Sequence, residues 1–264
     1  MYSPRGPHRR TLNQACLAFG LYLGRGIVVR ENQALATSTV PKLTWYGQSC
    51  FLMETPQGTR VLMDPTSTAS GYPVPETIPA DLVTISHEHP DHNSIKLAGG
   101  GAKVIRGLTA DKKGWMRINE KFRDVSVRTI GVYHDDELGR LRGLNSIFVF
   151  EVAGLRVAHL GDLGHTLSDR QLSNLGQVDV VMVPVGGNLT IDAERAARVV
   201  DQIRPRLIVV PMHYATDVST TKELASVGTF IEGRPHVRRL EGNSFLLSAL
   251  KKRPGAEVVV MNYK

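Results

Sequence analysis

A run of ligand-type side chains at residues 86–93, Ser-His-Glu-His-Pro-Asp-His-Asn, constrains this chain more than any other feature. It follows directly on the apolar stretch 81–85, which has the pattern of a strand. In an extended chain, His87 and His89 lie two positions apart and point to the same side, so both can hold one metal ion. A solvated polar loop seldom supplies this spacing at a strand end. The pattern therefore predicts a metal site.

The second half of the same run predicts ligands for a second ion. Pro90 turns the chain, so that Asp91 and His92 can reach another metal from the start of a helix. Glu88 points away from both ions in this interpretation and is not expected to be a ligand.

Three further candidate ligands stand alone, each behind an apolar run typical of a strand. They are His134 in Val-Tyr-His-Asp, Asp162 in His-Leu-Gly-Asp and His213 in Pro-Met-His-Tyr. A single histidine of this kind is ordinarily a hydrogen-bonded core residue. However, ligands that follow several strands can converge at one sheet edge, and the pattern suggests this arrangement.

With these residues the sequence resembles the metallo-β-lactamase superfamily. The hallmark of that superfamily is HxHxDH followed by a lone His, a lone Asp and a final His, and Asp64 in Leu-Met-Asp-Pro matches its first motif. The resemblance implies an α/β (α+β) fold, a four-layer αββα sandwich, over residues 42 to about 260. It also implies a ligand assignment: His87, His89 and His134 for the first metal, Asp91, His92 and His213 for the second, and Asp162 bridging the two.

Within the superfamily, the chain is similar to the branch of L-ascorbate 6-phosphate lactonase and related uncharacterised metal-dependent hydrolases. The segments 46–51, 184–190 and 211–214 carry this similarity. One position departs from it, because Gln48 stands where the branch often has His, which puts any role of that histidine in question. Such a resemblance implies a fold and a metal site firmly and a substrate poorly.

The ligand types suit two divalent ions, with Zn2+ favoured and Mn2+ or Fe2+ as alternatives. Two such ions about 3.5–4 Å apart would share a water and lower its pKa towards about 7. The resulting metal-bound hydroxide would attack a small ester, lactone or phosphorylated metabolite. Asp91 or His165 would serve the leaving group as the catalytic proton donor.

Two other functions stay open. One is a phosphodiesterase or nuclease of the same fold, although RNA-processing relatives usually add a large insert, and only 50 positions lie between Asp162 and His213. The other, from a different class, is a non-catalytic metal-binding module. The complete ligand set argues against that class.

Several other polar residues have weaker assignments. Asp64 is expected to support a ligand imidazole rather than to bind metal directly. His159 either lies buried in a structural role or contributes to the site. Arg140 and Arg142 are expected to lie in a solvated loop, with binding of an anionic substrate group as the alternative.

From residue 42 onward, short apolar runs alternate with turn signals. Strands are expected at 43–46, 49–54, 60–63, 81–86, 103–106, 125–132, 146–152, 155–160, 178–185 and 207–211. Apolar positions at helical spacing predict an amphipathic helix over 193–203, and weaker patterns predict helices over 167–175 and 221–230.

Charge, hydropathy and cysteine content argue against nucleic-acid-binding, membrane-spanning and disulfide-rich proteins. The formal charge is +7, but residues 1–40 carry five arginines against Glu31 alone, which leaves only +3 for the rest. Nucleic-acid binding is therefore not favoured, and no apolar run is long enough to span a membrane. Cys16 and Cys50 form no framework, and Cys50 is expected to be a small buried hydrophobe. A small-molecule substrate is the expected partner, and a homo-oligomer stays open.

The N-terminal segment is expected to lie outside the folded domain, which divides the chain into residues 1–41 and 42–264. His8–Leu12, the apolar run 15–23 and the small residues at 34–36 resemble a twin-arginine export signal. However, the apolar run is short, and charged residues follow it closely. The prediction is a cytoplasmic protein, with export as the alternative.

Overall fold

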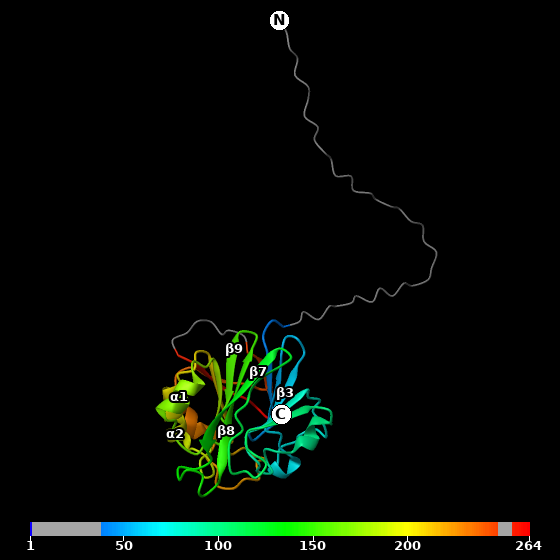
Figure 1. Cartoon of the computed structure of the whole chain (residues 1–264). Coiled ribbons are helices and arrows are strands. Elements are labelled where there is room, and N and C mark those ends of the chain that lie inside the picture. Colours follow the sequence, from blue (N-terminus) through cyan, green and yellow to red (C-terminus); the bar gives the residue numbers. More distant parts are fainter. Residues whose placement is uncertain (2–37, 248–254) are drawn as a thin grey trace, which may run out of the picture. The chain divides into compact units, whose positions relative to one another are not determined.

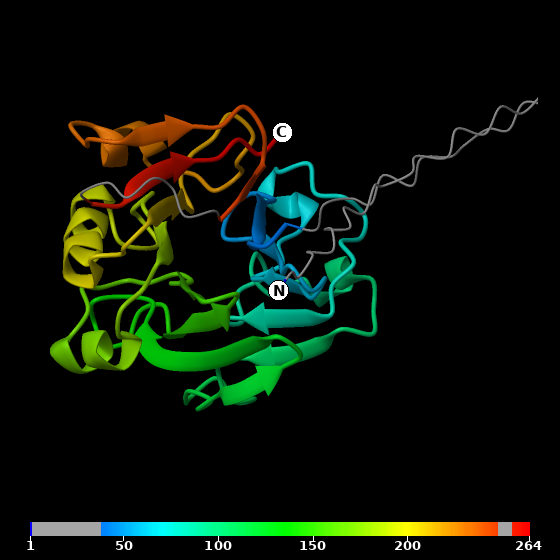
Figure 2. The same ribbon diagram turned by 90° about the horizontal axis from the view of Figure 1, so that it is seen from above.

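The computed structural model describes Met1, residues 38–247 and residues 255–264 (Figures 1 and 2). The predicted extension or export signal, residues 1–41, therefore lies almost entirely outside the described residues. In the described part of the chain, no helix combines the length and the apolar character that crossing a membrane requires.

Two β-sheets form the body of the domain, and the first has six strands in the order β13-β1-β2-β3-β4-β5. Its strands are β1 (Lys42–Trp45), β2 (Phe51–Glu54), β3 (Arg60–Met63), β4 (Leu82–Ile85), β5 (Lys103–Arg106) and β13 (Ser244–Leu246). The first three strands are antiparallel neighbours, whereas β4 and β5 add in parallel to β3. The turn between β2 and β3 is closed by a hydrogen bond from Gly58 N to Thr55 O.

The second sheet has eight strands in the order β12-β14-β11-β10-β9-β8-β7-β6. Its strands are β6 (Asn119–Phe122), β7 (Val125–Tyr133), β8 (Leu144–Val152), β9 (Leu155–His159), β10 (Val180–Pro184), β11 (Ile208–Met212), β12 (Val237–Arg239) and β14 (Glu257–Val260). β9, β10 and β11 are parallel, and β7 runs the same way because β7 and β9 both pair antiparallel with β8. The carboxyl ends of β7, β9 and β11 therefore meet at one edge of the sheet.

Alternating side chains of the first sheet feed two separate cores. Met53 and Val61 belong to the main core, whereas Leu52 and Leu62, the next residues in their strands, belong to a smaller cluster. Successive side chains point to opposite faces of a strand, so the two sets lie on opposite faces of this sheet. Because the main core also contains the buried residues of β8 to β11, it lies between the two sheets.

The α-helices lie on the second sheet. They are α1 (Asp169–Leu175), α2 (Ala193–Ile203) and α3 (Val227–Ile231). α1 contacts β7, and α2 contacts both β10 and α3 (Figure 1). α2 has the predicted bounds, and it begins where the Asp192 side chain accepts a hydrogen bond from Arg195 N.

The outer face of the first sheet carries a much thinner layer. Its smaller core is closed by Ile78 and by Leu97 and Ala98 of a 3-10 helix, η2 (Ile95–Ala98). A second 3-10 helix, η1 (Thr68–Ser70), lies in the loop of residues 65–79, which contains four prolines. Proline removes a backbone donor and clashes within a helix, which disfavours a regular α-helix here. The predicted mixed α/β sandwich is confirmed, with helices that are mainly on one side.

Most predicted strands agree with the structure to within two residues. The patterns missed β6, β12, β13 and β14, which are short strands. β6, Asn-Glu-Lys-Phe, has no buried residue, and its pairing with β7 maintains it. The helix predicted over 221–230 was wrong at its start, because α3 begins only at Val227.

We expect a chain that begins at Pro41 to fold as the full chain does. The described core begins at Leu43, and Pro41 O accepts a hydrogen bond from Leu247 N that this truncation retains. Thermal unfolding should give midpoints within about 3 °C of each other, which is less than about 1 kcal/mol for a domain of this size. Loss of soluble protein on truncation would show that residues 1–40 are needed for the fold. A mature N-terminus at Thr37 in native material would instead establish export.

Candidate metal centre

The seven predicted ligands occupy turns that follow four strands. His87, His89, Asp91 and His92 follow β4 of the first sheet, whereas His134, Asp162 and His213 follow β7, β9 and β11 of the second. A hydrogen bond from Ser146 N to Ser86 O joins the β4 turn to β8. The candidate centre thus lies where an end of each sheet meets the other.

Six of the seven ligands form two groups, in each of which the ligand atoms lie within 4.8 Å of one another. The first group is His87, His89 and His134, and the second group is Asp91, His92 and His213. His89 is exposed and the Asp91 side chain is 33% exposed, whereas the other four are buried. The centre therefore opens to solvent beside one member of each group.

Asp162 lies between the two groups. Its Oδ2 atom is 3.2 Å from His92 Nε2, 3.2 Å from His134 Nε2, 3.3 Å from His213 Nε2 and 3.9 Å from His87 Nε2. The carboxylate is buried, and burial alone would raise its pKa. The facing imidazoles, His213 and His92 first, nevertheless hold the pKa of Asp162 well below its usual range.

The residues present fit a metal cation, because several buried ring nitrogens have no hydrogen-bond partner. These are His92 Nε2 and both ring nitrogens of His134 and of His213. Although their Nε2 atoms lie close to Asp162 Oδ2, none forms a hydrogen bond with it. A cation among these atoms would satisfy the nitrogens and the carboxylate together, which a bare buried cluster does not.

The turn after Pro90 differs from its prediction. His92 N donates to His89 O, and no α-helix starts here, since the next helix is η2 from Ile95. The Asn93 side chain donates to Glu88 O, and Ser94 N donates to Pro65 O, so the backbone is held by the adjacent loop. The turn still brings Asp91 and His92 into the second group.

Asp64 supports histidines of both groups. Its Oδ2 accepts a hydrogen bond from His92 Nδ1 (2.9 Å) and one from Ser86 Oγ (2.5 Å), while Oδ1 accepts from Ser86 N (2.7 Å). Ser86 Oγ in turn lies 2.9 Å from His87 Nδ1. Asp64 also forms a close triad with His87 and His92; it contacts His92 Nδ1 directly and is linked to His87 Nδ1 through Ser86 Oγ. This is the supporting position that the sequence predicts.

The electrostatic environment shifts the pKa values of these histidines in opposite directions. Burial, reinforced by the neighbouring His92, lowers the pKa of His87 well below its usual value, and burial also lowers the pKa of His89. Burial would lower that of His92 too, but the Asp162 and Asp91 carboxylates raise its pKa well above the usual range. A metal ion bound at His92 Nε2 would have to displace the proton that this raised pKa favours, so the affinity for metal would fall at low pH.

Gln48 connects the turn between β1 and β2 to the second group. Its buried Nε2 donates to Asp91 Oδ2 (3.1 Å), and its backbone carbonyl accepts from His213 N (3.2 Å) and Trp45 Nε1 (3.0 Å). Burial would raise the pKa of Asp91, but the His92 charge lowers it to about 2. The residue that departs from the branch pattern thus donates a hydrogen bond to a candidate ligand.

The two remaining histidines near the centre have both ring nitrogens occupied. His159 is buried, lies 2.9 Å from Ser49 O through Nε2 and accepts from Gly161 N, which favours the structural alternative. His165 Nδ1 lies 2.7 Å from Thr166 O, and its Nε2 accepts from Tyr133 N (3.0 Å). A proton donor at His165 would have to break one of these bonds.

Sequence reasoning did not find the supporting roles of Ser86, Ser49 and the Gln48 amide. Ser49 Oγ lies 3.5 Å from Asp162 Oδ1. The only signal for Ser86 was its position directly before His87, and its link to Asp64 depends on the parallel pairing of β3 with β4. Cys50 is buried, as predicted, and burial raises the pKa of its thiol to about 12.

Comparisons with known proteins identify the family of this chain. The model of the Beta-lactamase superfamily domain matches residues 42–213. A UPF0173 metal-dependent hydrolase of Anaeromyxobacter sp. (strain K) is 31% identical over 231 residues, which cover 76% of this chain and 84% of the relative. A UPF0173 protein of Pyrococcus furiosus is 35% identical over 191 residues, covering 66% and 84%.

Solved structures give the same result. A Thermotoga maritima structure, named as a Zn-dependent hydrolase of the metallo-β-lactamase superfamily, superposes with a TM-score of 0.64 at 31% identity and covers 84% of this chain and 98% of its own. A metallo hydrolase from Ignicoccus hospitalis gives a TM-score of 0.53 at 25% identity, covering 69% and 87%. The chain therefore belongs to the metallo-β-lactamase superfamily, as a metal-dependent hydrolase related to the UPF0173 proteins.

Proposed function

We propose that the protein is a binuclear hydrolase of small esters, lactones or phosphorylated metabolites, with zinc as the favoured metal. The observation that carries the proposal is the position of Asp162 Oδ2, which faces ring nitrogens of both groups at 3.2–3.9 Å. The first group would hold one ion, the second group would hold the other, and Asp162 would bridge them. Imidazole-rich sites suit zinc, and the Thermotoga maritima relative is named as Zn-dependent.

Metal ions held by the two groups would supply a Lewis acid that lowers the pKa of a bound water and offsets negative charge on the attacked oxygen. The chain contributes proton transfer, which we assign to Asp91. Its side chain belongs to the second group and is partly exposed, so it would accept a proton from the attacking water and pass it to the leaving group. His165 is the alternative donor.

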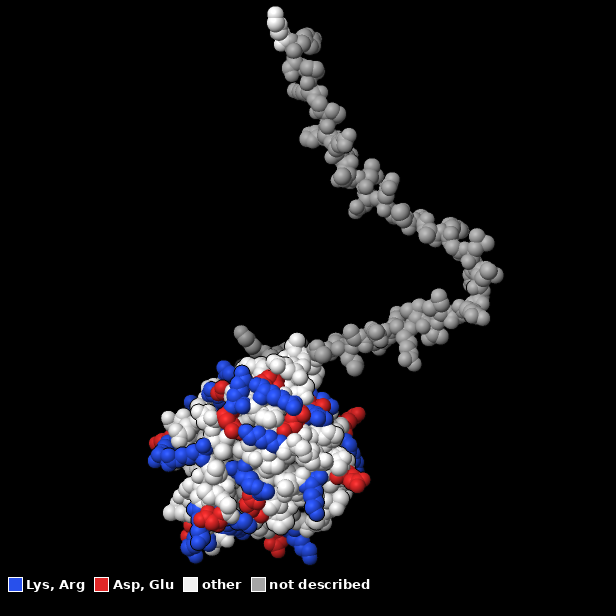
Figure 3. Space-filling view, turned by 45° about the vertical axis from the view of Figure 1, so that its right-hand side comes forward, with Lys and Arg blue, Asp and Glu red and all other residues white. Residues whose placement is uncertain are grey.

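A phosphodiesterase or nuclease is less well supported. On the face seen in Figure 3, basic side chains are interspersed with acidic ones and form no continuous basic stripe. Recognition of a nucleic-acid backbone rests on such a stripe. The non-catalytic alternative is disfavoured because all seven side chains of the family pattern are present and close together.

The purified protein should bind two metals per chain, because seven ligands are too many for one tetrahedral zinc. Elemental analysis after dialysis should give a ratio close to two. At most one metal per chain, even after loading with zinc or manganese, would contradict the binuclear site.

Variants of Asp162 and Asp91 should separate the two ions. Asp162→Ala should weaken both, because its carboxylate faces both groups, whereas Asp91→Ala should spare the first ion and lose the second. Both variants should lose about three orders of magnitude in turnover, which corresponds to about 4 kcal/mol of barrier. Calorimetric metal titration and rates on chromogenic esters, lactones and phosphodiesters measure these effects. Two tight metals or near-native turnover in Asp91→Ala would refute this assignment of the second ion.

Gln48→Leu should weaken binding of the second ion about tenfold and leave binding of the first unchanged, since it removes the hydrogen-bond donor to Asp91. The fold should tolerate the change, because the Gln48 Oε1 atom is buried without a partner and leucine removes it. Gln202→Leu is the matched control, because Gln202 lies in α2 and its side chain forms hydrogen bonds with the Leu167 backbone, away from the metal centre. If Gln48→Leu binds both metals like the unaltered protein, Gln48 does not position Asp91.

A further inference from the structure

A small cavity adjoins the exposed side of the first group. Its volume is about 180 Å3, and it is lined by His87, His89, Leu108, Lys112, Arg142 and Leu144, among others. A substrate whose reacting centre lies at the metals would extend part of its structure into this space. The charges around the cavity therefore bear on which substrates fit.

Two cations in this lining have no acidic partner in the part of the chain that the structure describes. Neither the Lys112 ammonium nor the Arg142 guanidinium forms an ion pair or a side-chain hydrogen bond with any residue in the ranges 38–247 and 255–264. Glu88 also lines the cavity, but its carboxylate receives two hydrogen bonds of 2.6 Å from Arg106. The charge of Glu88 is thus already balanced, and the cavity has an excess of positive charge.

The acidic residues nearest in sequence are committed elsewhere. The Asp111 carboxylate accepts hydrogen bonds from Thr109 Oγ1 and Lys113 N. Asp136 pairs with Arg195, and Glu137 pairs with Arg140. Arg140 is therefore the solvated loop residue that the sequence predicts, whereas Arg142 is not paired in this way.

The loop that carries Arg142 is held in place by one buried carboxylate. Asp135 accepts hydrogen bonds from four backbone amides, those of Glu137, Gly139, Leu141 and Arg142, at 2.6–3.0 Å. The backbone of Arg142 is thus fixed beside the cavity while its guanidinium remains available.

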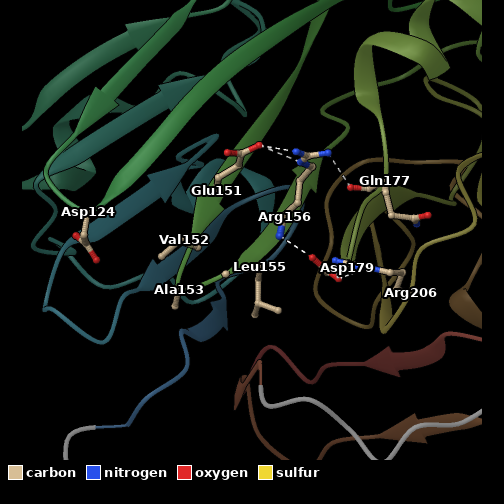
Figure 4. Close-up of a pocket in the computed structure, with 10 residues that line it drawn as sticks. Asp124, Glu151, Val152, Ala153, Leu155, Arg156, Gln177, Asp179 and Arg206 are labelled. Atoms are coloured by element: carbon tan, nitrogen blue, oxygen red, sulfur yellow. Dashed lines mark hydrogen bonds and ion pairs between the residues drawn. The ribbon is translucent and has the colours of Figure 1, made fainter.

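A larger cavity elsewhere shows the contrast. It has a volume of about 520 Å3 and lies at the opposite end of the second sheet, where Asp179 and Arg206 precede β10 and β11 (Figure 4). Its arginines are paired, Arg156 with Glu151 and Arg206 with Asp179. Those cations satisfy structural carboxylates and are not free to bind a ligand.

We propose that Lys112 and Arg142 form an anion subsite, which binds a carboxylate or phosphate group of the substrate beside the first group. The inference rests on the proposed function for the reacting end of the substrate. Arginine offers a planar fork that matches both anions, and lysine adds a flexible charge. Substrates with an anionic substituent near the scissile bond are therefore preferred over their neutral analogues.

Binding of inhibitors tests the subsite without any need for turnover. The probes are benzoate, isophthalate and 3-phosphonobenzoate, titrated by calorimetry into the zinc-loaded full chain. The second anionic group should strengthen binding about tenfold, and the larger gain of the two identifies the preferred anion. The gain should shrink at high salt, because exposed charges are screened. If benzoate and both dianions bind equally well, there is no anion subsite.

Lys112→Met and Arg142→Met should each remove part of this gain, and the double variant should remove all of it while binding benzoate normally. Arg140→Met is the matched control, because Arg140 is a neighbouring arginine already paired with Glu137. A double variant that keeps the tenfold preference would overturn the assignment of these two residues.

Turnover provides the second readout. The anionic ester 3-carboxy-4-nitrophenyl acetate should have a KM about tenfold lower than 4-nitrophenyl acetate. The double variant of Lys112 and Arg142 should raise the KM for the anionic ester and leave that for 4-nitrophenyl acetate unchanged. Equal KM values in the unaltered protein would contradict a role in substrate selection. Absence of metal-dependent hydrolysis of every ester, lactone and phosphodiester would refute the proposed function, whereas the inhibitor titrations would still decide the anion subsite.

Discussion

One buried carboxylate, that of Asp162, is the constraint around which the candidate centre is arranged. An isolated charge at this depth is strongly unfavourable, so positive or polar groups must face it. The imidazoles of His92, His134 and His213 do so, and they come from both sheets. The two sheets must therefore pack so that the end of β4 lies beside the ends of β7, β9 and β11. The candidate centre therefore forms only when the two sheets pack in this way.

The backbone around the centre is shaped by the same requirement. Gln48, Asp64 and His213 all have positive φ values, of 50°, 43° and 52°, a region that side chains other than glycine seldom adopt. Gly161, also at positive φ, has no room for a Cβ, which would lie 2.4 Å from Asn145 Oδ1. Such strain persists only where surrounding contacts impose it, and here it occurs both in turns that carry candidate ligands and in turns that carry their supporting residues.

The supporting residues form hydrogen bonds with members of both groups. Asp64 holds His92 directly and reaches His87 through Ser86, while Gln48 holds Asp91 and receives the backbone of His213. On the open side, Asp135 orders the loop that carries Arg142. His87 and His92 are thus hydrogen bonded within the fold, whereas His89, beside the cavity, and Asp91 are the members exposed to solvent, where a substrate would enter.

The sequence by itself determined the strand pattern from Lys42 onward, helix α2 and the set of ligand-type residues, because periodicity and the HxHxDH spacing are local properties. It could not show that three turns, distant in the chain, bring six candidate ligands into two groups around Asp162 on a fourth. It also missed the short strands β6 and β12 to β14 and the hydrogen bonds of Ser86 and Gln48. It did not distinguish Arg140, paired with Glu137, from Arg142, which has no ion-pair partner among the described residues. These features depend on which strands pair and which charges meet in space, and only the tertiary structure decides that.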